Sequence, residues 1–194
     1  FCMLFLSSWG GFKASAQCSK KFSFLQVLAG RFEMTEFKFR MGQNDGSYAY
    51  LFEGFINETS SFPSMPDKLP ENIIIDLEKV SMINSIGVRK WMEWSSQLPR
   101  TNVVLRKIPK ALVDQMNMVA GFMPGHAKIE SFFVPYYFDK TDEVLELLYN
   151  NGPDFTQGSQ GKEGSYKIKD YKHPETGEMG ELDVMEDRYF KIIL

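Results

Sequence analysis

Cysteine is nearly absent from the sequence. Only two of its 194 residues are cysteines, Cys2 and Cys18, and both precede residue 34. The region that follows contains none, so neither disulfide bonds nor thiol chemistry contributes to its fold or its function.

Long apolar segments and a surplus of positive charge are absent as well. No apolar run approaches the roughly 20 residues that a helix needs to cross a bilayer, which predicts a soluble protein without a membrane partner. Twenty-two lysines and arginines oppose 25 aspartates and glutamates, for a net charge of -3. Because non-specific nucleic-acid binding needs a basic surface, we expect no nucleic-acid partner. The hydrophobic fraction of 43% is ample for a folded core.

Motifs that carry catalysis are missing too. The only two histidines, His126 and His173, adjoin glycine or proline in predicted loops, where we expect solvated surface residues. The sequence has no phosphate-binding glycine loop and no G-x-S-x-G elbow. Ser85 at a helix start, or the carboxylates Asp76 and Glu78 at a strand end, would be the residues of an unrecognised hydrolase. We favour a protein that is not an enzyme and has no cofactor.

Residues 1–33 form a leader whose role has two interpretations. Its apolar beginning and the small residues of Ala14-Ser15-Ala16 fit a secretory signal, but the basic region of such a signal is missing. The alternative is that translation starts at Met34, directly before the first predicted strand. We favour this alternative and expect the leader to be disordered or not translated.

Predicted strands and helices alternate from residue 34 to 138. The order β-β-β-α-β-α-β predicts an α/β domain, in which helices cover a mixed sheet with parallel neighbours. Prolines exclude a long helix at 59–70, and Pro135 predicts that the end of the last strand lies at an edge or beyond the sheet. The predicted elements are strands at 37–41, 48–56, 72–77, 102–108 and 128–138, and helices at 85–98 and 109–122.

The helix at 85–98 has one apolar face. Asn84 is placed to cap its first turn, and Gly87 would let it approach the sheet closely. The residues of the predicted buried stripe are Ile83, Gly87, Trp91, Trp94 and Leu98.

Residues 139–194 are predicted to form a β-rich appendage. The segment 142–149 fits either a short helix or a strand. The glycines of 150–164 predict a flexible loop. Alternation at 165–172, followed by a turn at 176–178, predicts a small C-terminal β-hairpin.

The stretch from Asp76 to Gly87, DLEKVSMINSIG, resembles the centre of a STAS domain, the module of bacterial anti-sigma factor antagonists. The pattern there is D-L-x-x-V-x-x-[IM]-[DN]-S-x-G. The resemblance implies a STAS-like fold and a non-catalytic, cytoplasmic module of bacterial regulation. Its partner would be an anti-sigma-factor-like kinase or another regulatory protein. The implied partner-binding residues are Asn84, Ser85, Ile86, Gly87 and Arg89.

The resemblance departs from the family at the phosphorylated position. In the family a serine follows the Asp-Ser pair and is phosphorylated by the partner kinase, whereas this chain has Asn84-Ser85-Ile86. We therefore expect the usual phospho-switch to be missing. Ile86 is interpreted as a core residue because it adjoins the apolar stripe; the alternative is a permanent partner contact.

Two tail segments, 134–141 and 173–177, resemble the knuckles of a zinc ribbon. The positions that would hold cysteine are Phe138, Thr141, His173 and Thr176. Zinc needs about four nitrogen or sulfur ligands, and this set offers one imidazole, so we expect no bound metal.

A third possibility is a small-ligand sensor with a pocket between the strand at 128–138 and the tail. Met116, Met118 and Met123 would suit an adaptable binding surface. We interpret them instead as residues that fill gaps in the core.

Overall fold

The computed structural model describes residues 35–44, 47–65, 70–159 and 161–194. The predictions for residues 1–33 and for a start at Met34 lie outside these residues. From Met34 to Leu194 the chain forms a single compact unit.

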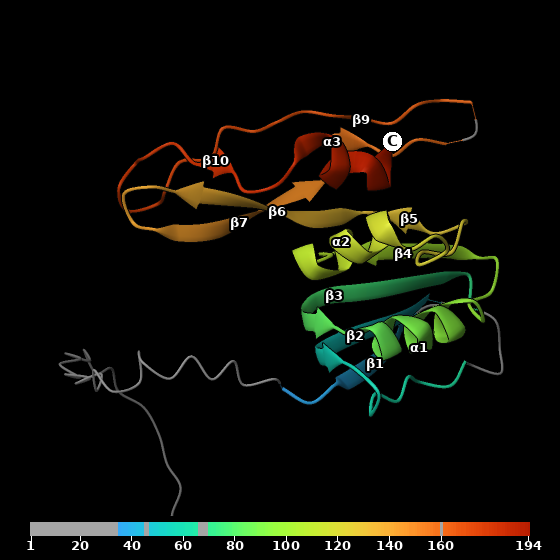
Figure 1. Cartoon of the computed structure of the whole chain (residues 1–194). Helices are drawn as coiled ribbons and strands as arrows, with labels where there is room; N and C mark the ends of the chain where they lie inside the picture. The colour runs from blue at the N-terminus through green and yellow to red at the C-terminus, as the bar shows by residue number, and fades with distance from the viewer. Residues whose placement is uncertain (1–34, 45–46, 66–69, 160) are drawn as a thin grey trace, which may run out of the picture. The chain divides into compact units, whose positions relative to one another are not determined.

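A mixed sheet of five strands organises the first half of this unit (Figure 1). β1 and β2 are antiparallel, and each later strand runs parallel to the one before it. In the order of the sheet, the strands are β1 (Lys38–Asn44), β2 (Ser47–Ile56), β3 (Asn72–Ile83), β4 (Asn102–Arg106) and β5 (Lys128–Ile129).

Two helices connect the parallel strands. α1 (Ser85–Ser95) joins β3 to β4, and α2 (Lys110–Met118) joins β4 to β5. Both crossovers proceed in the same direction along the sheet, so right-handed connections place both helices on one face (Figure 1). Burial alternates accordingly along β2: Tyr50 and Phe52 are buried beneath the helices, whereas Leu51 points to the other face and is half-buried.

The mixed α/β class and the predicted order β-β-β-α-β-α are confirmed. The predicted last strand, 128–138, is not a single strand: it is interrupted at Glu130, and only β5 joins the first sheet, whereas Ser131–Phe138 belongs to a second sheet. Helix α2 ends at Met118, earlier than predicted. β3 is twice as long as the predicted 72–77 because it continues through Glu78 and Lys79 along β2. Two register shifts in the β2–β3 pairing accommodate this extension.

A second sheet has the order β10-β6-β7. Of the two positions predicted for the end of the strand 128–138, the one beyond the first sheet is confirmed, because Pro135 lies in the second sheet. The edge position is wrong, because β6 is the middle strand of that sheet and its ladder with β7 continues to Phe138. The carbonyl of Pro135 accepts a hydrogen bond from Asp183 N, so it points away from β7. The proline nitrogen, which has no hydrogen to donate, points to the same side, where β10 provides only two paired residues. Pro135 therefore leaves the ladder with β7 intact. The strands are β6 (Ser131–Phe138), β7 (Glu143–Asn150) and β10 (Glu181–Leu182).

The tail is continuous with the rest of the core. The segment 142–149, left open between helix and strand, forms β7, so the predicted boundary after residue 138 falls in the turn between β6 and β7. The predicted loop 150–164 contains Phe155, which is buried against Phe132. The remaining elements are β8 (Phe155–Thr156), β9 (Ser165–Tyr166), α3 (Glu186–Tyr189) and the 3-10 helix η1 (Phe190–Ile193).

Among the described residues, no helix combines the length and the apolar character needed to span a bilayer.

Candidate functional site

The start of α1 is capped as predicted. Asn84 Oδ1 accepts a hydrogen bond from Gly87 N at 2.8 Å, and Asn84 Nδ2 donates one to Glu58 Oε2 at 2.9 Å. The hydrogen bond from Asn84 is the main cause that lowers the pKa of the Glu58 carboxyl, and Lys90 adds to it. The cap therefore also holds the loop that follows β2.

Gly87 sets the distance between α1 and the sheet. A Cβ atom at this position would lie 2.2 Å from the carbonyl oxygen of Ile56 at the end of β2. The same oxygen accepts a hydrogen bond from Asn84 N at 3.1 Å. Only glycine permits this approach, so the predicted close contact is confirmed.

The rest of α1 is fixed on two sides. Lys90 Nζ donates hydrogen bonds to the carbonyl oxygens of Glu58 and Ser60, which attaches the helix to the loop after β2. Trp91 and Trp94 lie in the core, where their indole N–H groups donate to Phe122 O and Pro63 O, both at 2.8 Å. All five residues of the predicted apolar stripe are buried.

The exposed side of the helix start presents Ser85, Ile86 and Arg89. The interpretation of Ile86 as a core residue is wrong, because 49% of it is exposed. At about 100° per residue, Ile86 lies roughly 140° around the helix from the centre of the buried face, so its side chain points away from the sheet. The buried residues that define this face are Gly87, Val88, Trp91, Trp94 and Ser95. Met82, at the end of β3, is 40% exposed. We call Ser85, Ile86 and Arg89 the α1 surface.

The five residues predicted for partner binding thus divide into two groups. Asn84 and Gly87 position the helix, whereas Ser85, Ile86 and Arg89 are accessible. Arg89 forms no ion pair with another residue in the described part of the chain.

The residues considered for hydrolysis are not assembled around Ser85. Within the described segments, the Ser85 side chain has no hydrogen-bond partner. Asp76 is buried and pairs with Arg106 at 2.8 Å, while Glu78 pairs with Lys107 at 2.8 Å. The hydrogen bond to Glu78 is the main cause that raises the pKa of the Lys107 ammonium.

The interpretation of His173 as a solvated surface residue is wrong, because His173 is only 4% exposed. Its Nδ1 lies 3.2 Å from the backbone nitrogens of Glu175 and Thr176 and accepts hydrogen bonds from both. The proton is therefore on Nε2, which donates to Glu143 Oε2 at 3.0 Å. The ring also packs edge-on against Phe138, with centroids 5.0 Å apart.

Two of the four zinc-ribbon positions, Phe138 and His173, are thus in contact, but they form an aromatic and hydrogen-bonded turn. In the segments that the structure describes, no three His, Cys, Asp or Glu side chains form a group that could hold a metal ion.

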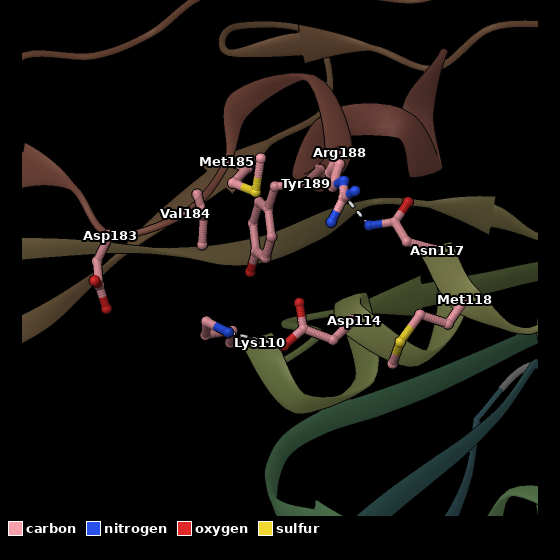
Figure 2. A pocket seen from close by; sticks show the side chains of 9 residues that line it. All are labelled: Lys110, Asp114, Asn117, Met118, Asp183, Val184, Met185, Arg188 and Tyr189. Atoms are coloured by element: carbon pink, nitrogen blue, oxygen red, sulfur yellow. Dashed lines mark hydrogen bonds and ion pairs between the residues drawn. The ribbon is translucent and has the colours of Figure 1, made fainter.

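The space between β6 and the tail, where the sequence suggested a ligand pocket, is filled by aromatic side chains. Phe132 packs against Phe155 and Phe190, with centroids 5.0 and 5.9 Å apart. A cavity of about 340 Å³ lies instead between α2 and the segment 183–189 (Figure 2). We call it the α2–α3 groove. Its lining residues are Lys110, Asp114, Asn117, Met118, Asp183, Val184, Met185, Arg188 and Tyr189.

Sequence reasoning missed this groove. Its signal on α2 was the spacing of Lys110, Asp114 and Asn117, which places three polar residues on one helix face. Met118, interpreted as a core residue, is 69% exposed, so that interpretation is wrong. Met116 and Met123 do pack against the core, as interpreted.

Comparison with family models, with curated proteins and with solved structures finds no match to this chain.

Proposed function

We propose that this protein is a non-catalytic interaction module that binds a partner protein through the α1 surface. The observation that carries the proposal is the exposure of Ile86, 49% of which is open to solvent on a helix start held by its neighbours. An exposed apolar side chain on a rigid element binds at low entropic cost, because little has to be ordered on association.

The composition of the α1 surface supports a protein partner. Ile86 supplies apolar area, and the exposed residues Ser85 and Arg89 on the same helix start are polar. Protein interfaces commonly combine an apolar centre with a polar rim, and arginine is enriched at their energetic centres.

The charge of this surface favours an acidic partner. Arg89 has no ion-pair partner among the described residues, and the first turn of α1 contains no acidic residue. The Glu58 carboxylate already lies beside the Asn84 cap, so the positive end of the helix dipole is partly offset within the chain. The charge that remains for an Asp or Glu of a partner is that of Arg89.

The finer assignment belongs to this proposal: a STAS-like module of cytoplasmic bacterial regulation, with an anti-sigma-factor-like kinase or another regulatory protein as its partner. Its support is the D-L-x-x-V…N-S-x-G stretch, which spans the end of β3 and the start of α1. Ile86 at the phosphorylated position makes docking permanent. Ser85 does not replace that serine, since it points about 100° away around the helix.

The absence of catalysis is also part of the proposal. Asp76 and Glu78 are engaged in ion pairs, and Ser85 has no hydrogen-bonded base in the described part of the chain. A nucleophilic serine requires such a base.

The test is to isolate the partner with the wild-type protein and to repeat the binding with purified components. Ile86→Glu and Arg89→Glu should each weaken binding at least tenfold, because the first buries a charge and the second opposes an acidic partner. Ile168→Glu is the matched control, since Ile168 is 38% exposed and lies in the tail. All variants should melt near the wild-type temperature.

Ser85→Ala should bind as the wild type does, and mass spectrometry of protein from cells should find Ser85 unphosphorylated. Equal binding by Ile86→Glu and wild type would refute the docking site. Phosphate on Ser85, together with loss of binding in Ser85→Asp, would refute permanent docking.

A further inference from the structure

The α2–α3 groove has an apolar middle. Met118 on α2 and Met185 before α3 are 69% and 62% exposed, so two flexible apolar side chains border an open space. Tyr189 forms part of the wall and is 3% exposed, while its hydroxyl donates to Phe133 O. A ligand with an apolar body would cover the methionines, whose thioethers adapt to different shapes.

Hydrogen bonds and ion pairs fix the groove walls. Asn117 Nδ2 donates to Tyr189 O at 3.1 Å, which ties α2 to α3. Lys110 and Asp114, one helical turn apart on α2, pair with each other at 2.8 Å. These two charges therefore neutralise each other, and neither requires an opposite charge on a ligand.

The remaining two charges of the lining are opposite in sign. Asp183 and Arg188 form no ion pair with each other or with another residue of the described segments. Figure 2 shows them at opposite ends of the groove, with Val184, Met185 and Tyr189 between them. The groove therefore offers a carboxylate, an apolar middle and a guanidinium, in that order.

We infer that the α2–α3 groove binds a short apolar peptide with free ends, its ammonium group at Asp183 and its carboxylate at Arg188. This is the ligand class that complements both unpaired charges and the apolar middle together. The volume of about 340 Å³ falls at the small end of the range of ligand pockets, which suits two or three residues. A simple carboxylic acid would leave Asp183 unmatched, and a simple amine would leave Arg188 unmatched. This site is separate from the α1 surface and goes beyond the proposed function.

The test uses leucyl-leucine and leucyl-leucyl-leucine, each with free ends, with an acetylated amino end and with an amidated carboxyl end. Titration into the full chain labelled with ¹³C-methyl methionine should shift the signals of Met118 and Met185. Each capped peptide should bind about fivefold more weakly than the free peptide, as expected for loss of one partly exposed ion pair.

Two variants assign the peptide ends. Arg188→Gln should weaken binding of the free peptide about fivefold but leave binding of the amidated peptide unchanged. Asp183→Asn should likewise weaken binding of the free peptide about fivefold and leave binding of the acetylated peptide unchanged. Arg100→Gln and Asp187→Asn are the matched controls, because both residues are exposed and neither lines the groove.

Three results would overturn the inference. They are no shift of the Met118 and Met185 signals up to the solubility limit, equal binding of the free peptides and the capped peptides, or peptide binding that is unchanged by Arg188→Gln. Ile86→Glu should leave peptide binding unchanged, so failure here is distinguishable from failure of the proposed function.

Discussion

Replacing Gly87 by alanine should destabilise the protein, although alanine is the better helix former. A Cβ atom would lie 2.2 Å from Ile56 O and 2.7 Å from Ile56 C, whereas ordinary contacts begin at 3.4 Å. The obstacle is the backbone of β2, which cannot turn aside as a side chain would. The start of α1 must therefore move away from the sheet by about 1 Å.

The magnitude follows from three contributions. Overpacking against a rigid neighbour costs about 1–3 kcal/mol. The displacement also weakens the hydrogen bond from Asn84 N to Ile56 O, which contributes roughly 1 kcal/mol. The helix propensity of alanine returns about 1 kcal/mol. We expect the free energy of unfolding to fall by about 2 kcal/mol.

Urea denaturation followed by circular dichroism measures this change. Gly125→Ala is the matched control, because a Cβ atom at Gly125 meets nothing within 4 Å. That variant should remain within about 0.5 kcal/mol of the wild type. If Gly87→Ala proved as stable as wild type, the close approach of α1 to β2 would not be a constraint on the fold.

Three further predictions concern other contacts. His173→Asn keeps the acceptor for the following turn and loses the donor to Glu143, whereas His173→Gln keeps the donor and loses the acceptor. In urea denaturation, each should lower the unfolding free energy by about 1–2 kcal/mol, which is less than the loss in His173→Ala. Equal stability of all three variants would contradict hydrogen bonding by both ring nitrogens. Burial raises the pKa of Tyr149 above its ordinary value of 10.0, so the unfolded chain loses this proton first. The contribution of Tyr149 to the unfolding free energy should therefore be constant below about pH 10 and fall as the pH rises above it. Tyr149→Phe should reduce this fall. An unchanged dependence of the unfolding free energy on pH in this variant would refute the role of Tyr149. Asn84→Ala should lower the unfolding free energy by about 1 kcal/mol, because the helix loses its cap. It should also raise the pKa of the Glu58 carboxyl toward its ordinary value, which an NMR titration would detect. An unchanged Glu58 pKa would contradict the role of Asn84 in holding this carboxylate.

The elements that sequence reasoning predicted well are those set by local periodicity. The stripe of α1 repeats every three to four residues, and its burial follows directly from that repeat. Asn84 caps the helix because an amide oxygen before the first turn finds free N–H groups wherever the helix lies. These properties depend on neighbours in the sequence.

The wrong predictions concern residues whose burial or exposure depends on segments distant in the sequence. Ile86 is apolar, as core residues are, but the close contact of Gly87 with β2 fixes which face of α1 is buried, and Ile86 lies on the opposite side of the helix. His173 looked like a loop residue, and only its contact with β6 and β7 makes it buried. The α2–α3 groove is bounded by Asn117 and Tyr189, which are 72 residues apart, so neither segment alone reveals it.

The arrangement of β6 has a consequence for synthesis on the ribosome. Its aromatic face, represented by Phe132, is covered by Tyr189 and Phe190, with centroids 6.2 and 5.9 Å away. The five strands of the first sheet have all been translated by residue 129, and β7 by residue 150. A nascent chain of that length already holds the β6–β7 hairpin, and Phe155 follows soon after to cover part of its aromatic side. The part that Tyr189 and Phe190 cover stays exposed until some forty residues after β7 have emerged. During this interval the strand is open to chaperones and to pairing with other nascent chains, so a pause in translation within the tail would lower the yield of folded protein.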